Sequence, residues 1–388
     1  MQVTSVRVGR AGGIAPAPHL ILFACMFVGQ AALIALSPVL AEVARDFDVS
    51  TATAGQLRAV SGLVAGATAA GMGLIATRLG IRDLLILGLW LLIGGSLLSA
   101  AAPSFAVLAA AQVPVGAGLG IVLSAALAGA AEWVPDERRS GALSWTLVGP
   151  PAAWVVGLPV IGLVGQVSWR LGWIAVPFAA GVVALAAVAT RCPDEPVQRT
   201  RGALAGNPRL RLWGLGELLA FSAWSGTVVY VGALLVESYD ISVATAGLVL
   251  GASAAAHLPG TFLARRIASP SPLRLLVALA LALAAAVAVF GAWRPALGAS
   301  AMLFTLLAFL AGARTFAGSA TGLAVAPGDK LLAMRVRAAA LQFGYLVGSV
   351  VGGIALSAQG YGAMGFTFAF LFAAAALVQT AIGRDRAG

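Results

Sequence analysis

A stretch of nine residues occurs twice in this chain, first at 47–55 and again at 239–247. The first copy reads Phe-Asp-Val-Ser-Thr-Ala-Thr-Ala-Gly and the second Tyr-Asp-Ile-Ser-Val-Ala-Thr-Ala-Gly, so six of the nine positions are identical. The offset of 192 residues is close to half of the 388-residue chain. The repeat predicts one unit written twice, with a short polar turn joining the first two helices of each half. Chance similarity between alanine-rich segments is the alternative.

Long apolar runs precede and follow both copies of this stretch. Hydrophobic residues make up 60% of the chain and charged residues only 10%, whereas soluble proteins carry about 25% charged residues. A bilayer requires spans of about 20 apolar residues whose backbone groups are satisfied internally. Because the apolar runs are continuous rather than alternating, the sequence predicts an all-α integral membrane protein that crosses the membrane many times.

The apolar segments predict twelve transmembrane helices in two pseudo-symmetric bundles of six. A connector at 191–208, rich in Pro, Arg and acidic residues, separates an N-terminal bundle at 18–190 from a C-terminal bundle at 209–383. Tails at 1–17 and 384–388 flank the bundles. The predicted segments are 18–41, 52–76, 83–102, 104–132, 139–165, 171–190, 209–237, 243–264, 272–292, 296–322, 331–358 and 361–382.

The basic residues predict the orientation. With a cytoplasmic N-terminus, 19 of the 24 Lys and Arg residues fall on the inner side, and four fall on or toward the outer side: Arg45, Arg58, Arg170 and Arg294. This positive-inside bias predicts that both termini are cytoplasmic in a multi-pass protein of the plasma (inner) membrane. Secondary transporters use parallel repeats of this kind, with a substrate site between the halves near the midplane. We therefore expect a small-molecule substrate and a monomer.

Residues 73–82 read Gly-Leu-Ile-Ala-Thr-Arg-Leu-Gly-Ile-Arg. This run resembles the signature Gly-x-Leu-Ala-Asp-Arg-x-Gly-Arg-Lys of the major facilitator superfamily, in its loop between helices 2 and 3. The resemblance implies a gating loop that latches helices at the cytoplasmic side. Thr77 replaces the acidic residue of the signature. Either Asp83 or Glu132 is a candidate to supply the missing carboxylate. The residues that match the signature are Gly73, Ala76, Arg78, Gly80 and Arg82.

Further stretches resemble the twelve-helix drug:proton antiporter branch, which includes arabinose-efflux-like and chloramphenicol-resistance-like proteins. They are 36–40 with 47–50, 157–165 with 169–170, and 342–344 with the glycines that follow. The resemblance implies proton-coupled efflux of amphipathic or hydrophobic compounds. The chain departs from the pattern of this branch at two positions. Gln112 replaces the arginine of the helix 4 motif, and Gln30 lies where several drug exporters carry an acidic residue. Both positions are implicated in proton coupling in relatives, which puts that route in doubt here.

Three titratable residues in apolar segments are candidates for proton coupling. Burying a charged side chain in a bilayer is energetically costly, so such residues usually have a function. Glu217 lies about two turns into the seventh segment, and desolvation suits a proton carrier; an interfacial glutamate near Arg209 and Arg211 is the alternative. Glu132 ends the fourth segment and is equally consistent with an interfacial role. His257 is a candidate because histidine ordinarily titrates near neutral pH; the alternative is that a lone histidine in a helix is simply hydrogen-bonded.

Two arginines are candidates for binding an anionic substrate or a buried carboxylate. Arg314 lies near the middle of the tenth segment, where its charge cannot easily reach water. Arg58 lies about two turns into the second segment, and snorkelling to the outer interface is its alternative role.

Polar and aromatic side chains in the apolar segments are candidates for the cavity wall, and small residues are candidates for helix sliding. Aromatic residues are also common at lipid interfaces, and glycines also serve packing alone. The cavity candidates are Gln30, Gln112, Trp145, Trp154, Trp224, Tyr230, Gln342 and Tyr345. The helix-flexing candidates are Gly157, Pro159, Gly162, Gly344, Gly348 and Gly352.

The sequence contains no metal-ligand cluster, phosphate loop or nucleophile with a base, so we expect neither an enzyme nor a cofactor. Alternating-access transport with proton-coupled efflux is the favoured function. A carrier of small organic anions is the alternative that Arg58 and Arg314 suggest, and a non-transporting membrane sensor is a third.

Overall fold

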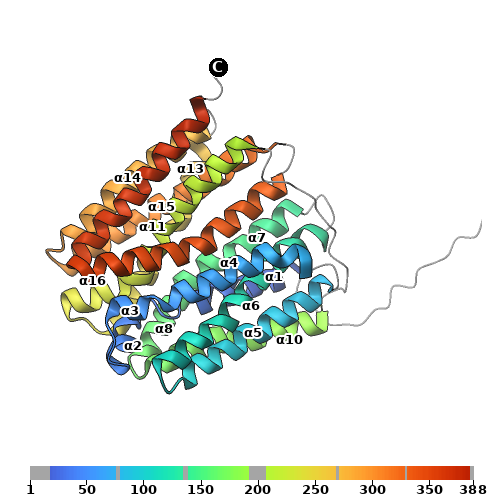
Figure 1. The fold of residues 1–388 in the computed structure, drawn as a ribbon. Helices are drawn as coiled ribbons and strands as arrows, with labels where there is room; N and C mark the ends of the chain where they lie inside the picture. Colours follow the sequence, from blue (N-terminus) through green and yellow to red (C-terminus); the bar gives the residue numbers. More distant parts are fainter. Residues whose placement is uncertain are drawn as a thin grey trace, which may run out of the picture.

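The computed structural model describes residues 18–75, 79–133, 139–191, 207–267, 271–327 and 330–384. These residues form a bundle of long helices (Figure 1), in which residues 18–191 make the first half and residues 207–384 the second. In that view the first half, coloured blue to green, lies below the second half, coloured yellow to red. The all-helical fold that the apolar runs predict is confirmed.

In the first half, the predicted segments correspond to helices that are interrupted at prolines and glycines. The predicted segment 18–41 is broken, because Pro38 cannot donate a backbone hydrogen bond and residues 35–39 form a turn. The helices are α1 (Pro18–Ile34), α2 (Leu40–Asp46), α3 (Thr51–Gly55), α4 (Leu57–Ile75), α5 (Ile81–Ala101), α6 (Phe105–Glu132), α7 (Arg139–Ala152), α8 (Leu158–Gly165), α9 (Trp169–Trp173) and α10 (Ala179–Arg191).

Two wide π-helical turns join helices of the first half that the sequence predicts as continuous. The turn η2 (Ala153–Gly157) connects α7 to α8, and η3 (Ile174–Phe178) connects α9 to α10. Prolines explain both positions, because Pro159 follows η2 and Pro177 lies inside η3, and each removes a backbone donor from its helix. Such π turns are frequent at functional sites.

In the second half, the last element spans two predicted segments. Its backbone leaves the helical region at Gln359 and Gly360, and Gly360 has a φ of 73° that glycine adopts without strain. The helices are α11 (Pro208–Tyr239), α12 (Val243–Ala254), α13 (His257–Ile267), α14 (Pro272–Ala292), α15 (Leu297–Val325) and α16 (Lys330–Arg384).

The duplicated stretch forms the same turn in both halves. Asp48 and Asp240 adopt left-handed backbone conformations with φ of 51° and 50°, which Asp tolerates better than most residues. Ser50 then caps α3 by accepting a hydrogen bond from the Thr53 amide at 3.1 Å, and Ser242 caps α12 through Thr245 at the same distance. The repeat is therefore structural. We call the end of the bundle that carries both turns the Asp-turn end.

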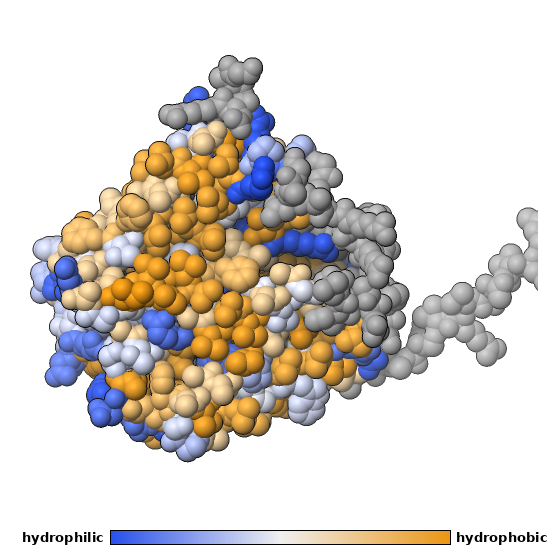
Figure 2. All heavy atoms as spheres, viewed as in Figure 1, coloured by the Kyte–Doolittle hydropathy of each residue, from blue (hydrophilic) through white to orange (hydrophobic). Residues whose placement is uncertain are grey.

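The helices are long and apolar enough to cross a membrane. Nine candidate spans occur in the described residues, and one of them, Leu332–Ile382, runs through the break at Gly360. The count of twelve helices stays a prediction. Figure 2 shows that hydrophobic residues cover most of the viewed face, and hydrophilic residues gather toward its lower left edge. Large hydrophobic side chains, among them Phe262, Met302 and Phe370, are exposed, as expected for a bilayer-embedded bundle.

The two halves contact each other closely at the Asp-turn end. Gly162 of α8 crosses Gly247 of α12 so tightly that a Cβ on Gly162 would lie 2.7 Å from the Gly247 Cα. Similarly, a Cβ on Gly62 of α4 would lie 2.8 Å from the carbonyl oxygen of Gln342 in α16. Because these glycines are in the parts of their helices nearest the Asp turns, the bundle is closed at that end.

Candidate substrate cavity and buried charge clusters

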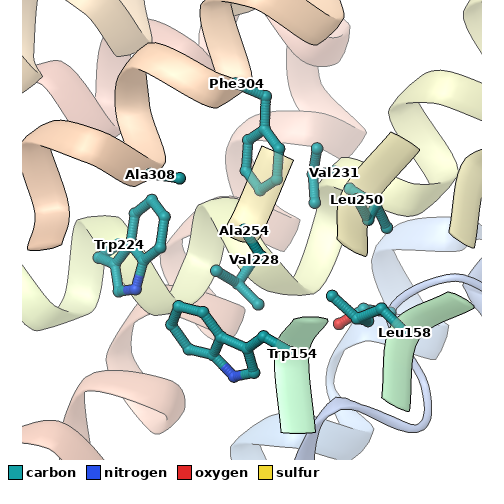
Figure 3. A pocket seen from close by; sticks show the side chains of 10 residues that line it. Trp154, Leu158, Trp224, Val228, Val231, Leu250, Ala254, Phe304 and Ala308 are labelled. Atoms are coloured by element: carbon teal, nitrogen blue, oxygen red, sulfur yellow. The ribbon is translucent and has the colours of Figure 1, made fainter. Parts of the chain in front are cut away.

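A small cavity lies between the two halves (Figure 3). The first half contributes Ser37, Trp154 and Leu158 to its wall. The second half contributes Trp224, Val228, Val231, Leu250, Ala254, Phe304 and Ala308. The lining is almost entirely apolar, and a cavity with such walls between two rigid bundles suits a hydrophobic or aromatic ligand.

Aromatic rings from both halves meet at this cavity. Trp224 of α11 stacks on Phe304 of α15, with ring centroids 6.2 Å apart and planes 9° apart. Trp154, which the π turn η2 carries, lies 5.8 Å from Trp224 and 5.5 Å from the ring of His257. The Trp154–Trp224 contact therefore spans the two halves, and a flat ligand can be held by offset stacking with these rings.

A helical stripe on α11 explains why the cavity forms there. Glu217, Phe221, Trp224, Val228 and Val231 follow one another at intervals of four or three residues, which places them on one face of the helix. The α11 residues from Ala220 to Val236 are buried throughout, so both faces of the helix contact protein. Sequence reasoning named Glu217 and Trp224 but missed their neighbours, although this periodicity was available to find them.

A second small cavity shares one wall residue, Trp224, with the first. Its wall includes two further aromatic residues, Phe221 and Phe372, and one charged residue, Arg314. The remaining lining residues are Ala220, Leu283, Ala311 and Thr315. A buried cation thus lies in the wall of a largely apolar cavity.

Arg314 belongs to a buried charge cluster centred on Glu217. The Glu217 carboxylate is fully buried and accepts from Arg314 Nη2 at 2.8 Å and from Arg337 Nε at 3.1 Å. Gln379 Nε2 lies 3.4 Å from the same carboxylate. The cluster carries two guanidinium groups and one carboxylate, so its formal charge is positive. Arg314 Nε has no hydrogen-bond partner among the described residues.

Arg337 is the principal residue of this cluster that sequence reasoning missed. The sequence count placed it among the cytoplasmic-side charges, yet it lies inside the second half, where it donates to the Thr315 carbonyl at 3.1 Å. Its guanidinium also lies 5.0 Å from the Phe221 ring. Gly318 makes room for the carboxylate, because a Cβ there would lie 2.8 Å from Glu217 Oε2.

Arg58 lies in a separate cluster in the first half. Its side chain is 1% exposed, so it is enclosed by protein and does not reach the surface as snorkelling would require. Its Nη1 donates to Gln112 Oε1 at 3.3 Å, and its guanidinium lies 5.4 Å from the Trp173 ring. The positive charge that the family motif places at position 112 is thus supplied next to Gln112 by Arg58.

Two further cavity candidates, Gln30 and Tyr345, belong to the surroundings of Arg58. Gln30 hydrogen-bonds to the hydroxyl of Tyr345, which is close enough to Arg58 to interact with it electrostatically. Gln112 Nε2 donates to Ser99 Oγ at 3.1 Å. Neither described cavity has these residues in its wall.

Tyr230 lies at the contact between the halves near the Asp-turn end, outside both cavities. Its hydroxyl donates to the Ser349 carbonyl of α16 at 2.8 Å, and Gln56 Nε2 from the first half donates to the same oxygen at 3.0 Å. Closer to the turns, Thr51 donates to Glu237 at 2.5 Å, and Tyr361 donates to the other Glu237 oxygen at 2.8 Å. We call these six residues the Asp-end latch.

The remaining coupling and cavity candidates lie in different environments. His257 is 7% exposed, and its ring bonds to the Ala308 carbonyl while its Nδ1 has no partner among the described residues. Glu132 is half-buried at the end of α6. Gln342 is buried where α16 meets α4. Trp145 is 52% exposed and contacts His19, so it lies on the outside of the bundle and in neither cavity wall.

The gating-loop candidates are only partly within the structure. Thr77 and Arg78 lie outside the described residues, whereas Gly73 is in α4 and Gly80 precedes α5. Arg82 donates to the Ala189 carbonyl of α10, and Asp83 is exposed in the first turn of α5.

The helix-flexing candidates divide into two groups. Pro159 and Gly162 lie at the crossing of α8 with α12, between the halves, and Gly157 ends η2. Gly344, Gly348 and Gly352 instead pack α16 against Phe221, Ser222 and Phe368 within the second half.

A profile of the Major Facilitator Superfamily matches residues 22–330 of the chain. An uncharacterised transporter of this type from Bacillus subtilis is 24% identical over 94% of this chain and 91% of its own length. A chloramphenicol efflux pump of Mycobacterium tuberculosis is 32% identical, but over 44% of this chain and 42% of its own length. A further Bacillus subtilis relative is matched over 61% of its length, so the chain spans less than two thirds of several curated relatives.

Solved transporter structures share the fold. A bacterial homologue of the human lysosomal transporter Spinster, solved in an inward-facing and occupied conformation, has a TM-score of 0.76 and 16% identity over 94% of this chain and 96% of its own. A nucleoside transporter has the same TM-score with 14% identity, over 94% of this chain and 100% of its own.

Proposed function

This chain belongs to the major facilitator superfamily and is a multi-pass membrane transporter, and we propose that it exports small amphipathic or hydrophobic compounds in exchange for protons. The observation that carries the proposal is the cavity where Trp154 from one half faces Trp224 and Phe304 from the other. A ligand there touches both moving parts. Its binding energy can therefore differ between conformations, which a transport cycle requires.

Closure at the Asp-turn end supports a cycle of alternating access. The latch and the glycine crossings hold the halves together on that side of the cavity. With the positive-inside orientation, the Asp-turn end faces outward and the cytoplasmic side is the entry for exported compounds. We place the protein in the plasma (inner) membrane with both termini cytoplasmic. Export then requires the latch to open and the opposite ends of the halves to approach.

His257 is our first choice of proton carrier. Its Nδ1 carries a lone pair with no partner among the described residues, and its ring contacts Trp154 at the cavity. Protonation there would change the environment of an aromatic wall residue directly. Glu217 is a second choice, because its carboxylate is fully buried and pairs with two arginines.

The excess of positive charge beside the second cavity favours a second candidate function, transport of small organic anions. Arg314 lines the cavity and shares one carboxylate with Arg337. A substrate carboxylate would balance the remaining charge, since guanidinium groups pair strongly with carboxylates. The aromatic rings of Phe221 and Phe372 would then hold its apolar part.

Proteoliposome flux with an imposed pH gradient tests both candidates. The panel contains neutral, cationic and carboxylate-bearing aromatic compounds, with chloramphenicol among the neutral ones, and the membrane potential is clamped. We expect gradient-driven flux that Trp224→Ala reduces and that the matched control Trp145→Ala leaves intact, because Trp145 is exposed on the outside. Flux of neutral compounds that does not depend on the pH gradient contradicts proton coupling. Flux of the carboxylate-bearing compounds alone would favour transport of organic anions over efflux of hydrophobic compounds.

A further inference from the structure

Arg58 is a buried cation whose charge is not balanced by protein in this conformation. It is 1% exposed, and the salt bridges of the described residues do not include it. By contrast, the equally buried Arg314 is paired with Glu217. An isolated buried charge costs several kcal/mol, so such groups normally have a counter-ion.

Three nitrogen donors at and beside Arg58 have no acceptor among the described residues. They are Nε and Nη2 of Arg58 and Nε1 of Trp173, whose ring lies against the guanidinium. Gln30 and Tyr345, which hydrogen-bond to each other, complete the surroundings of Arg58. Unpaired N–H donors around one cation call for an acceptor with several lone pairs, and a water molecule or a cation meets that need less well than an anion.

We propose that this cluster is a binding site for a small inorganic monoanion, such as chloride, that is separate from the substrate cavities. Arg58 supplies the charge and two donors, and Trp173 supplies a third. Tyr345 covers the cluster from the second half, and the remaining residues come from α1, α4, α6 and α9 of the first half.

The enclosure of the cluster selects a small ion. Arg58 and Trp173 are at most 1% exposed, and neither lines either of the two cavities described above. An organic anion would need apolar walls for its body, which the Arg314 cavity has and the Arg58 cluster lacks. The site goes beyond the proposed function, because it does not depend on which compound is carried.

Thermal unfolding of the purified full-length protein tests the site. The protein is prepared in sodium gluconate, and chloride, bromide or acetate replaces gluconate at constant sodium concentration. We expect saturable stabilisation by chloride and bromide. Acetate tests whether a carboxylate is the ligand, and saturable stabilisation by acetate in place of the halides overturns the inorganic assignment. Absence of a shift with all three anions overturns the site itself.

Arginine variants and bromide localise the effect. Arg58→Gln removes the charge and should abolish the chloride-dependent shift, and Arg58→Lys, which keeps the charge but loses the forked donors, should weaken binding about tenfold. Arg170→Gln is the matched control, because Arg170 is a partly exposed surface arginine, and its shift should equal that of the wild type. Anomalous scattering from bromide in crystals of the wild type places the ion beside Arg58 independently. An unchanged shift in Arg58→Lys, or bromide bound only elsewhere, refutes the proposal.

Discussion

Glu217 Oε1 lies 2.8 Å from Arg314 Nη2, in a contact that joins two helices, α11 and α15, in the interior of the second half. Both side chains are almost inaccessible to solvent, at 0% and 5% exposed. Arg337 approaches the other carboxylate oxygen from α16. The carboxylate thus links three helices of one half, and its partner Arg314 lines the second cavity.

Glu217→Gln should destabilise the protein strongly. It leaves two buried guanidinium groups without a counter-charge, and loss of one member of a buried ion pair costs about 3–5 kcal/mol. Thermal unfolding of purified protein in detergent measures the change. The double variant Glu217→Gln with Arg337→Gln should recover part of the loss, because one uncompensated charge is then removed. Glu42→Gln is the control, since its pair with Arg45 is on the surface. Equal effects of the two glutamate substitutions would contradict this prediction.

Tyr230→Phe should shift the protein toward a conformation that is open at the Asp-turn end. The substitution keeps the ring but removes the hydroxyl, which contacts the first half through the Ala52 carbonyl at 3.4 Å and through Gln56 Nε2 at 3.5 Å. A hydrogen bond of this kind contributes about 1 kcal/mol, which corresponds to roughly a fivefold change in the ratio of closed to open molecules.

Distances between spin labels at Arg45→Cys and Ser238→Cys report this equilibrium, because both positions are exposed at the Asp-turn end in different halves. Cys25 and Cys192 are replaced by Ala in this background. The expected result is a larger population of long distances in Tyr230→Phe. Tyr239→Phe is the control, because Tyr239 bonds to Ser300 within the second half. A distance distribution that only Tyr239→Phe changes would remove Tyr230 from the latch.

The sequence was most informative where local pattern decides structure. Continuous apolar runs predicted the helices to within a few residues, as for α11, which begins at Pro208 and ends at Tyr239. The duplicated turn was predicted from six identities, and Asp48 and Asp240 confirm it with matching left-handed backbones. The interruption at Pro38 was missed because a single proline does not interrupt an apolar average.

The pairing of distant side chains could not be predicted from local pattern. Glu217 and Arg314 were both singled out, but nothing in a single sequence specifies that residues 97 positions apart are 2.8 Å from each other. Arg337 was assigned to the cytoplasmic side because it lies near the beginning of an apolar segment, where charges are usually interfacial. The closed Asp-turn end was not predictable either, since it depends on small energy differences between whole conformations.

The ion pair between Asp46 and Arg170 should contribute stability that is lost in acid. Arg170 Nη1 lies 2.7 Å from Asp46 Oδ2, and Trp169 Nε1 donates to the same oxygen at 2.9 Å. These hydrogen bonds, from Arg170 first and then Trp169, lower the pKa of Asp46 below its ordinary value of 3.8. Because the folded-state pKa is the lower one, the contribution is complete above the ordinary pKa and disappears as the pH falls through the lowered value.

Unfolding temperatures of the wild type and Asp46→Asn measured between pH 7 and pH 3 check this contribution. The difference between them should be constant near neutral pH and should narrow below about pH 4. Asp46 is partly exposed, so solvent and salt keep the difference small. A difference that grows in acid would show that the pair does not act as described.

Gly162→Ala should impair closure of the Asp-turn end and slow transport. A Cβ at position 162 would lie 2.7 Å from the Cα of Gly247 and 2.9 Å from the Val243 carbonyl oxygen, so α8 and α12 must separate to admit it. Real Cβ atoms do not tolerate such contacts with backbone, and overpacking of this kind typically costs about 1–3 kcal/mol.

The matched control is Gly94→Ala in α5, because a Cβ there has no neighbour within 4 Å among the described residues. That control should be neutral or slightly stabilising, since alanine favours helix over glycine by about 1 kcal/mol. Flux and the spin-label distances at Arg45→Cys and Ser238→Cys are measured for both variants. If Gly162→Ala keeps both the wild-type flux and the wild-type distances, the crossing of α8 with α12 is not a contact on which closure depends.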